Sequence, residues 1–193
     1  MPIGINGSGT VTGVSVGGLP DGIVDTDMLA ANAVTAAKTT VPGIVEVDQW
    51  ILTAAKSSNG DITSDLARNT LSGSAAPLGT GMSESSGIFS FPNTGKWLVF
   101  MQGKFGINNS DNVDLVMNVT TNNSSYGGVA FISDGQNGSG AREGGGASFY
   151  FLDVTDVSQV KVKFSVSSLG SGSELKGSNT VSTAFTFIRI GDT

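Results

Sequence analysis

The chain has 193 residues, enough for one ordinary domain and a modest extension, and its 28 glycines with only 13% charged residues are typical of short strands joined by many turns. It contains no cysteine and no histidine, which excludes disulfide scaffolds, thiolate nucleophiles, histidine general bases and the common zinc sites. The net charge is -6 and the ten Lys and Arg residues are scattered, so neither nucleic acid nor an anionic membrane surface is expected as a partner.

Residues 1–43 differ from the rest of the chain in being small, punctuated by glycine and almost free of aromatic side chains. Such a segment cannot bury a core by itself. Within it, early acidic residues, several alanines and a late lysine over residues 25–38 predict a short helix that needs partners to be stable. Because Pro42 and Gly43 then favour a chain reversal, we place a domain boundary between residues 43 and 44.

The first residues lack the basic start and apolar centre of a secretory signal. No apolar run in the chain approaches the length needed to cross a bilayer. We therefore expect the protein to be made and kept in the cytoplasm of the cell that synthesises it, with no membrane partner.

From residue 44 onward, strand candidates alternate with clusters of Gly, Asn, Asp and Ser at the spacing of a β-sandwich or jelly roll. This pattern predicts an all-β domain of roughly eight to ten strands. Val113, Leu115, Met117 and Val119 alternate with Asn112, Asp114 and Asn118, and residues 160–166 alternate between apolar and polar side chains, so each segment predicts a strand with one buried and one solvated face.

Three other strand candidates, residues 97–101, 149–152 and 184–190, are apolar on both faces. In an antiparallel sheet the second face normally meets water, so these strands predict an additional buried surface, most simply a subunit interface. The alternative is a single large core that curls over them. The residues assigned to an interface or core are Trp97, Phe100, Phe149, Tyr150, Phe151, Leu152, Phe185, Phe187 and Ile188.

The glycine-rich loop over residues 133–146 is a candidate recognition site. A phosphate cradle is disfavoured because a strand rather than a helix follows the loop and the required lysine is missing. Loops at the end of a rigid sandwich often carry binding, and a plain solvated connection is the alternative. The candidate contact residues are Gln136, Asn137, Arg142 and Glu143.

Paired acids could in principle hydrolyse a glycosidic bond or hold calcium, but turn-like surroundings favour solvated side chains. Trp50 and Trp97 lie in apolar strand patterns, so we assign them to the core rather than to sugar stacking. With no candidate base or nucleophile, we expect no enzymatic activity, cofactor or metal. The acid pairs are Asp25 with Asp27, Asp111 with Asp114, and Asp153 with Asp156.

Three segments resemble, in chain order, the C1q/TNF-like jelly roll as found in tailed-phage virion proteins: Asp48–Ala54 (DQWILTA), Gly79–Pro92 (GTGMSESSGIFSFP) and Phe185–Asp192 (FTFIRIGD). Together they span most of residues 44–193. Residues 7–22 (GSGTVTGVSVGGLPDG) are also similar to the start of fibre and appendage proteins of marine phages. No collagen-like Gly-X-Y run is present, so a complement or adipokine role is not implied.

The resemblance implies a homotrimer of jelly rolls around a threefold axis, with residues 1–43 as an extended, partly helical arm that anchors the protein to a particle. It implies a non-enzymatic capsid or neck decoration or short fibre on the virion surface, made in the host bacterial cytoplasm. The implied partners are further copies of the chain and the major capsid, portal or tail proteins. The alternative is a tail fibre tip adhesin that binds host surface glycan. The residues implied in anchoring are Val16, Gly17, Gly18, Leu19 and Pro20.

Overall fold

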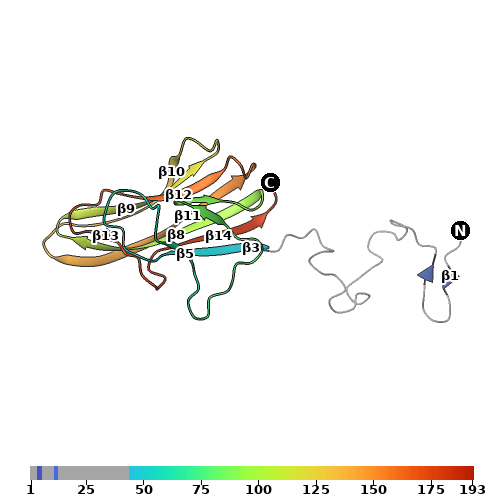
Figure 1. The fold of residues 1–193 in the computed structure, drawn as a ribbon, viewed down its shortest axis with the longest axis horizontal. Helices are drawn as coiled ribbons and strands as arrows, with labels where there is room; N and C mark the ends of the chain where they lie inside the picture. The colour runs from blue at the N-terminus through green and yellow to red at the C-terminus, as the bar shows by residue number, and fades with distance from the viewer. Residues whose placement is uncertain (1–3, 6–10, 13–43) are drawn as a thin grey trace. The chain divides into compact units, whose positions relative to one another are not determined.

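The structure is a computed structural model that describes residues 4–5, 11–12 and 44–193 (Figure 1). The chain divides into two compact units, Met1–Val41 and Pro42–Thr193. In the first unit, β1 (Gly4–Ile5) pairs with β2 (Val11–Thr12) in antiparallel fashion. The predicted helix over residues 25–38 and the anchoring residues Val16, Gly17, Gly18, Leu19 and Pro20 lie outside the described residues, so both remain predictions.

The second unit contains two antiparallel sheets of six strands each. The first, the β9 sheet, has the strand order β6–β7–β12–β9–β10, and β4 pairs with β12. Its strands are β4 (Gly60–Asp61), β6 (Ser83–Ser85), β7 (Ile88–Ser90), β9 (Asp111–Thr120), β10 (Gly127–Gln136) and β12 (Lys161–Ser167).

The other sheet, the β8 sheet, has the strand order β5–β3–β14–β8–β11, and β13 pairs with β8. Strands that follow one another in sequence often belong to opposite sheets, as β8 and β9 do, and so do β10 and β11. The strands of the β8 sheet are β3 (Glu46–Leu52), β5 (Leu66–Arg68), β8 (Gly95–Asn108), β11 (Ala141–Val154), β13 (Glu174–Leu175) and β14 (Ala184–Gly191).

This architecture confirms the predicted all-β sandwich, and no helix occurs among the residues that the structure describes. The strands of residues 44–193 outnumber the expected eight to ten because several have only two or three residues, as β4 and β13 do. Segments that short contain less than two periods of strand alternation, so sequence periodicity does not reveal them.

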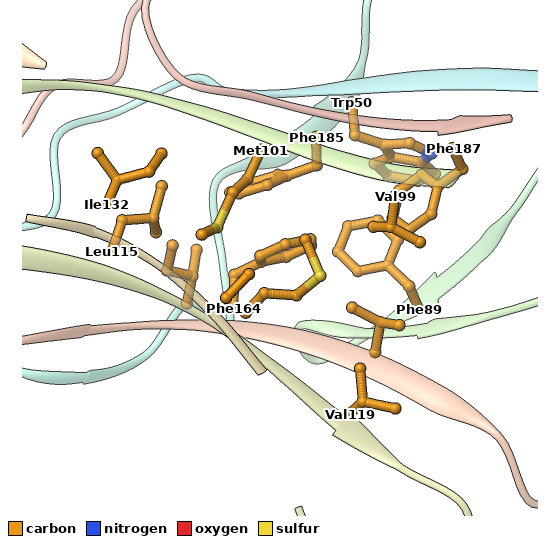
Figure 2. Close-up of a cluster of buried hydrophobic side chains, with 14 of the residues drawn as sticks. Trp50, Phe89, Val99, Met101, Leu115, Val119, Ile132, Phe164, Phe185 and Phe187 are labelled. Carbon is orange, nitrogen blue, oxygen red and sulfur yellow. The ribbon is translucent and has the colours of Figure 1, made fainter. Parts of the chain in front are cut away.

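The core lies between the two sheets and is rich in aromatic side chains (Figure 2). Phe164 of β12 stacks on Phe185 of β14, with ring centroids 3.8 Å apart and an interplanar angle of 18°. Phe89 of β7 meets Phe164 edge-on at 5.8 Å within the β9 sheet, and it packs in a tilted arrangement against Phe187 of β14 at 5.0 Å. The Phe164–Phe185 and Phe89–Phe187 contacts join the β9 sheet to the β8 sheet, so the sandwich is held together by aromatic packing as well as by area burial.

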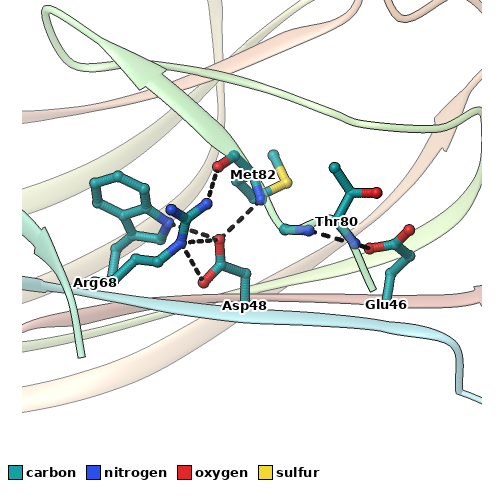
Figure 3. Close-up of polar contacts among 7 residues, drawn as sticks. Glu46, Asp48, Arg68, Thr80 and Met82 are labelled. Carbon is teal, nitrogen blue, oxygen red and sulfur yellow. Dashed lines mark hydrogen bonds and ion pairs between the residues drawn. The ribbon is translucent and has the colours of Figure 1, made fainter. Parts of the chain in front are cut away.

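Two acidic side chains of β3 are also buried, at 6% exposure for Glu46 and 3% for Asp48 (Figure 3). Asp48 accepts hydrogen bonds from Trp50 Nε1 at 2.9 Å and from the Met82 amide at 2.8 Å, and it pairs with Arg68 Nε at 3.1 Å. Because buried charges are stable only when their hydrogen bonds are satisfied, these contacts fix the segment before β6 against β3.

The Glu46 carboxylate accepts hydrogen bonds from the Thr80 amide at 3.0 Å and from the Asn93 side-chain amide at 2.7 Å. It thereby holds the turn at Thr80 against β3. Gly79 approaches so closely that an added Cβ would lie 2.3 Å from the Glu46 carboxylate, and its φ is +74°. Only glycine fits this position without displacing the acid.

Candidate functional site

The outward face of the β8 sheet carries exposed aromatic side chains. On β8, Trp97 faces the core and is 1% exposed, whereas Phe100 points outward and is 36% exposed. On the edge strand β11, Phe149 and Phe151 also point outward, at 59% and 54% exposure. The Phe100 and Phe149 rings lie side by side with centroids 5.4 Å apart. The face therefore presents an aromatic cluster to solvent in the single chain.

Strand register extends this cluster into a row across the whole sheet. Phe151 lies opposite Leu98, Leu98 opposite Ile188, and Ile188 opposite Val47. Val47 then forms a bridge with Leu78, which is 49% exposed. Each of these five side chains is apolar, and we call them the apolar row. It runs from the β11 edge to the opposite edge of the sheet.

The structure divides the nine residues predicted for an interface or core into two groups. Trp97, Leu152, Phe185 and Phe187 are at most 5% exposed and belong to the core, and half-buried Tyr150 packs against it. The outward group consists of Phe100, Phe149, Phe151 and Ile188.

A cavity of about 420 Å³ lies at the other end of the apolar row, beside β3 and β5. Val47 and Thr186 form part of its floor, and the segment from Ser74 to Leu78 forms a wall. The buried Asp48 and its partner Arg68 also line it. Sequence reasoning did not predict this cavity, because its walls come from strands and a loop that meet only in the folded sheet.

The predicted loop of residues 133–146 is mostly strand, because β10 ends at Gln136 and β11 begins at Ala141. Only residues 137–140 form the connection, which lies at the end of the sandwich remote from residue 44. Arg189 is opposite both Glu46 and Trp97, so β3 and β8 begin at the same end. β8 then continues for 14 residues to Asn108, a rise of about 40 Å. There the β8–β9, β10–β11 and β12–β13 connections come together, and we call this end the distal tip.

Two open cavities at the distal tip contain the four candidate recognition residues. Gln136 and Asn137 line a cavity of about 250 Å³, together with Asp111 and Ser168. A second cavity of about 420 Å³ lies nearby. It is lined by Arg142, Glu143, Asn108, Glu174 and Lys176. The predicted residues are thus brought to one end of the molecule but not into one site.

Ion pairs organise the larger distal cavity. Arg142 pairs with Asp134, and Glu143 pairs with Lys104 at 2.7 Å. Burial raises the pKa of Asp134, but hydrogen bonds from Arg142 and backbone amides outweigh it and hold that pKa below its ordinary value. The hydrogen bond from Lys104 lowers the pKa of Glu143. These acids are therefore charged at neutral pH.

Two more charged groups at the tip are held by hydrogen bonds. The Ser173 hydroxyl lowers the pKa of Asp111, and the Gly170 amide donates to the same carboxylate at 2.9 Å. Glu174 accepts from Lys176 at 2.6 Å and raises the pKa of that lysine. The distal tip therefore offers fixed charges of both signs beside neutral amides and hydroxyls, a chemistry suited to polar ligands.

Among the remaining candidates, the acid pair Asp25 with Asp27 lies outside the described residues, and the two tryptophans have ordinary structural roles. Trp50 and Trp97 are 9% and 1% exposed in the core, and the Trp97 indole donates to the Asn93 carbonyl at 3.2 Å. Among residues 44–193, no group of three acidic side chains converges as a metal site would require. In the described part of the chain, no helix is long and apolar enough to span a membrane.

Comparison with known proteins identifies the fold. No protein-family model and no curated protein matches the chain. The crystal structure of murine APRIL at pH 5.0 matches with a TM-score of 0.54 and 12% identity, covering 75% of this chain and 98% of that one. The structure of Eiger TNF from S. frugiperda matches with a TM-score of 0.55 and 11% identity, covering 78% and 96%. In fold, residues 44–193 are therefore a TNF-like jelly roll.

Proposed function

We propose that this chain is a non-enzymatic structural protein of a tailed-phage virion. In this proposal it forms a homotrimer that decorates the capsid or neck, or forms a short fibre there. The jelly-roll fold and the resemblance of the sequence to virion appendage proteins support the assignment. The single observation that carries the homotrimer is the apolar row with its exposed phenylalanines on the β8 sheet.

The apolar row favours self-association because it is contiguous. Single exposed apolar side chains are common on monomers, but a stripe that crosses an entire sheet is typical of an interface. Phe149 and Phe151 each leave more than half of their surface in water. Covering a phenylalanine fully is worth about 1.5–3 kcal/mol, so burial between copies is a substantial driving force.

The position of the distal tip supports display on a particle. Residue 44 enters the sandwich at the end where β3 and β8 begin, and the tip lies about 40 Å away along β8. If residues 1–43 anchor the protein, the tip is the part that faces outward. A fully extended arm of 43 residues reaches at most about 140 Å, which fits a short appendage.

Replacement of two exposed phenylalanines tests the trimer. The double substitution Phe149→Ser and Phe151→Ser should remove about 2–3 kcal/mol of contact energy per copy, since the exposed half of each side chain would be buried between copies. We expect wild-type protein to have the mass of a trimer in multi-angle light scattering, and the double variant that of a monomer.

The matched control for the trimer experiment is Phe131→Ser. Phe131 is equally exposed, at 57%, but it lies on β10 in the other sheet. This variant should remain trimeric. Wild-type protein that is monomeric at the same concentration would contradict the proposal, and so would a trimeric double variant.

Labelling of intact particles tests the virion role. Antibodies raised against residues 44–193 should decorate the capsid or neck of the phage that encodes the chain, in negative-stain micrographs with gold label. Mass spectrometry of the purified particles should detect the same chain. Particles without label and without the chain would contradict a virion role.

The second candidate function is a tail fibre tip adhesin that binds host surface glycan. The two polar cavities at the distal tip favour it, because saccharides are recognised by amides, hydroxyls and fixed charges. In the particle experiment this alternative gives label at the end of the tail instead of on the capsid or neck.

A further inference from the structure

We propose that Phe149 and Phe151 of one copy insert into the 420 Å³ cavity beside β3 and β5 of the next copy. This inference rests on the proposed homotrimer and specifies its contact. The two phenylalanines are called the knob, and the cavity lined by Val47, Thr186 and Leu78 is called the socket.

Knob and socket lie at opposite edges of the same sheet. The strand order β5–β3–β14–β8–β11 places the knob on the edge strand β11, and the socket beside β3 and the other edge strand, β5. Each copy thus offers one knob and one socket, which are different surfaces. Contacts between different surfaces join copies head to tail, and they form a ring if the rotation closes.

Strand register places knob and socket at the same level along the strands. Phe151 belongs to the apolar row that ends at Val47 and Leu78, both of which line the socket. Phe149 lies opposite Phe100, which lies opposite Thr186, another socket residue. A contact between equal levels adds no rise per copy along the strands, which is the condition for a flat ring once the rotation closes.

The chemistry of the socket suits an aromatic side chain. Ala75, Ala76 and Pro77 form an apolar wall, and the socket volume of about 420 Å³ is in the range of sites that bind aromatic groups. The Arg68 guanidinium at the socket, 5.0 Å from the Trp50 ring, is a further partner for an aromatic face.

A second copy of the chain is the favoured occupant of the socket. A foreign partner that filled the socket would leave Phe149 and Phe151 in water, whereas another copy covers the socket and the knob in one contact. The same interface then also continues along the apolar row. No other chain is needed to satisfy either surface.

Engineered cysteines test the contact, because the natural chain has none. In the double variant Phe151→Cys with Leu78→Cys, the two thiols of one copy lie four strand spacings apart, about 19 Å. A disulfide needs Cα atoms within about 7 Å, so any bond must join two copies. We expect oxidation or a short bismaleimide to give covalent dimers and trimers on denaturing gels.

Two controls define the geometry of this cross-link. A mixture of the two single-cysteine variants should give dimers and no covalent trimers, because each copy then has one thiol. Phe131→Cys with Leu78→Cys should give no product above background, since Phe131 lies in the other sheet. Products larger than a trimer would overturn the closed ring.

A third variant fills the socket without touching the knob. Ala76 is exposed, so Ala76→Trp should fold normally, and it should shift the protein from trimer to monomer in light scattering. A wild-type trimer that neither cross-links nor responds to Ala76→Trp would overturn the knob and socket and leave the proposed trimer intact. A monomeric wild-type protein would overturn both.

Discussion

Phe164→Ala is expected to lower the free energy of unfolding by about 4 kcal/mol. Phe164 is 1% exposed and stacks on Phe185 across the interface between the two sheets, at a centroid distance of 3.8 Å. Truncation would remove this contact and leave a cavity in the centre of the sandwich. Because the free energy of unfolding of a domain is typically about 5–15 kcal/mol, this single change should remove a large part of it.

Chemical denaturation followed by circular dichroism measures this effect. Wild type and variant must be compared at one fixed protein concentration, since self-association contributes to the apparent stability. The matched control is Phe131→Ala, which removes an equally large side chain from the same sheet at a position 57% exposed, and it should change stability by less than about 1 kcal/mol. Similar losses for the two variants would mean that the aromatic stack does not hold the sheets together.

The two strands predicted from period-two alternation show how much of the fold the sequence predicts. In residues 113–119, Val113, Leu115 and Met117 are each fully buried, as their period of two predicts. Residues 160–166 behave in the same way, with Val162 and Phe164 buried. A mostly polar second face favours one arrangement against the core, so periodicity assigns both strands. It does not predict that Val116, on the second face of residues 113–119, is also buried, at 6% exposure.

The strands that are apolar on both faces were a harder problem. Strand periodicity predicts that Phe149 and Phe151 share one face of the strand and that Tyr150 and Leu152 share the other. It does not predict which of the two faces points to the core. Pairing with β8 decides it, because Leu152 lies opposite the buried Trp97 and Phe149 opposite the outward Phe100. The candidate interface could be predicted as a surface, whereas its residues required the sheet.

Charged residues of β3 were missed altogether. Glu46 and Asp48 alternate in phase with the buried Trp50 and Leu52, and this signal would have placed them inward. A buried acid is nevertheless rare unless partners satisfy it. The partners of Asp48 include Met82, 34 residues away in sequence, and sequence patterns do not reveal such a contact.

The distal tip was foreseen only in part for the same reason. The loop of residues 133–146 contributes Gln136 and Arg142 to it, but the walls of the two cavities also include Asp111 and Lys176. Asp111 begins β9 and Lys176 directly follows β13, so both reach the tip from strands outside that segment. The candidate site is therefore a property of three converging connections rather than of one glycine-rich loop.

Asp48 connects the stability of the domain to its proposed assembly. Its carboxylate accepts hydrogen bonds from Trp50 and Met82 and pairs with Arg68, and both Asp48 and Arg68 line the socket. Asp153 offers a matched control, because it pairs with Lys96 on the outward face of the same sheet and its side chain is 43% exposed. The two acids therefore differ mainly in burial.

Asp48→Ala should lower the free energy of unfolding by about 3 kcal/mol, because it leaves buried donors of Trp50 and Met82 without an acceptor. Asp153→Ala should cost less than about 1 kcal/mol, since water screens an exposed ion pair. Denaturation at fixed protein concentration measures both losses. Because the same contact fixes a wall of the socket, Asp48→Ala should also reduce trimer formation at concentrations where Asp153→Ala remains trimeric. Equal stabilities of the two variants would show that the buried carboxylate is dispensable.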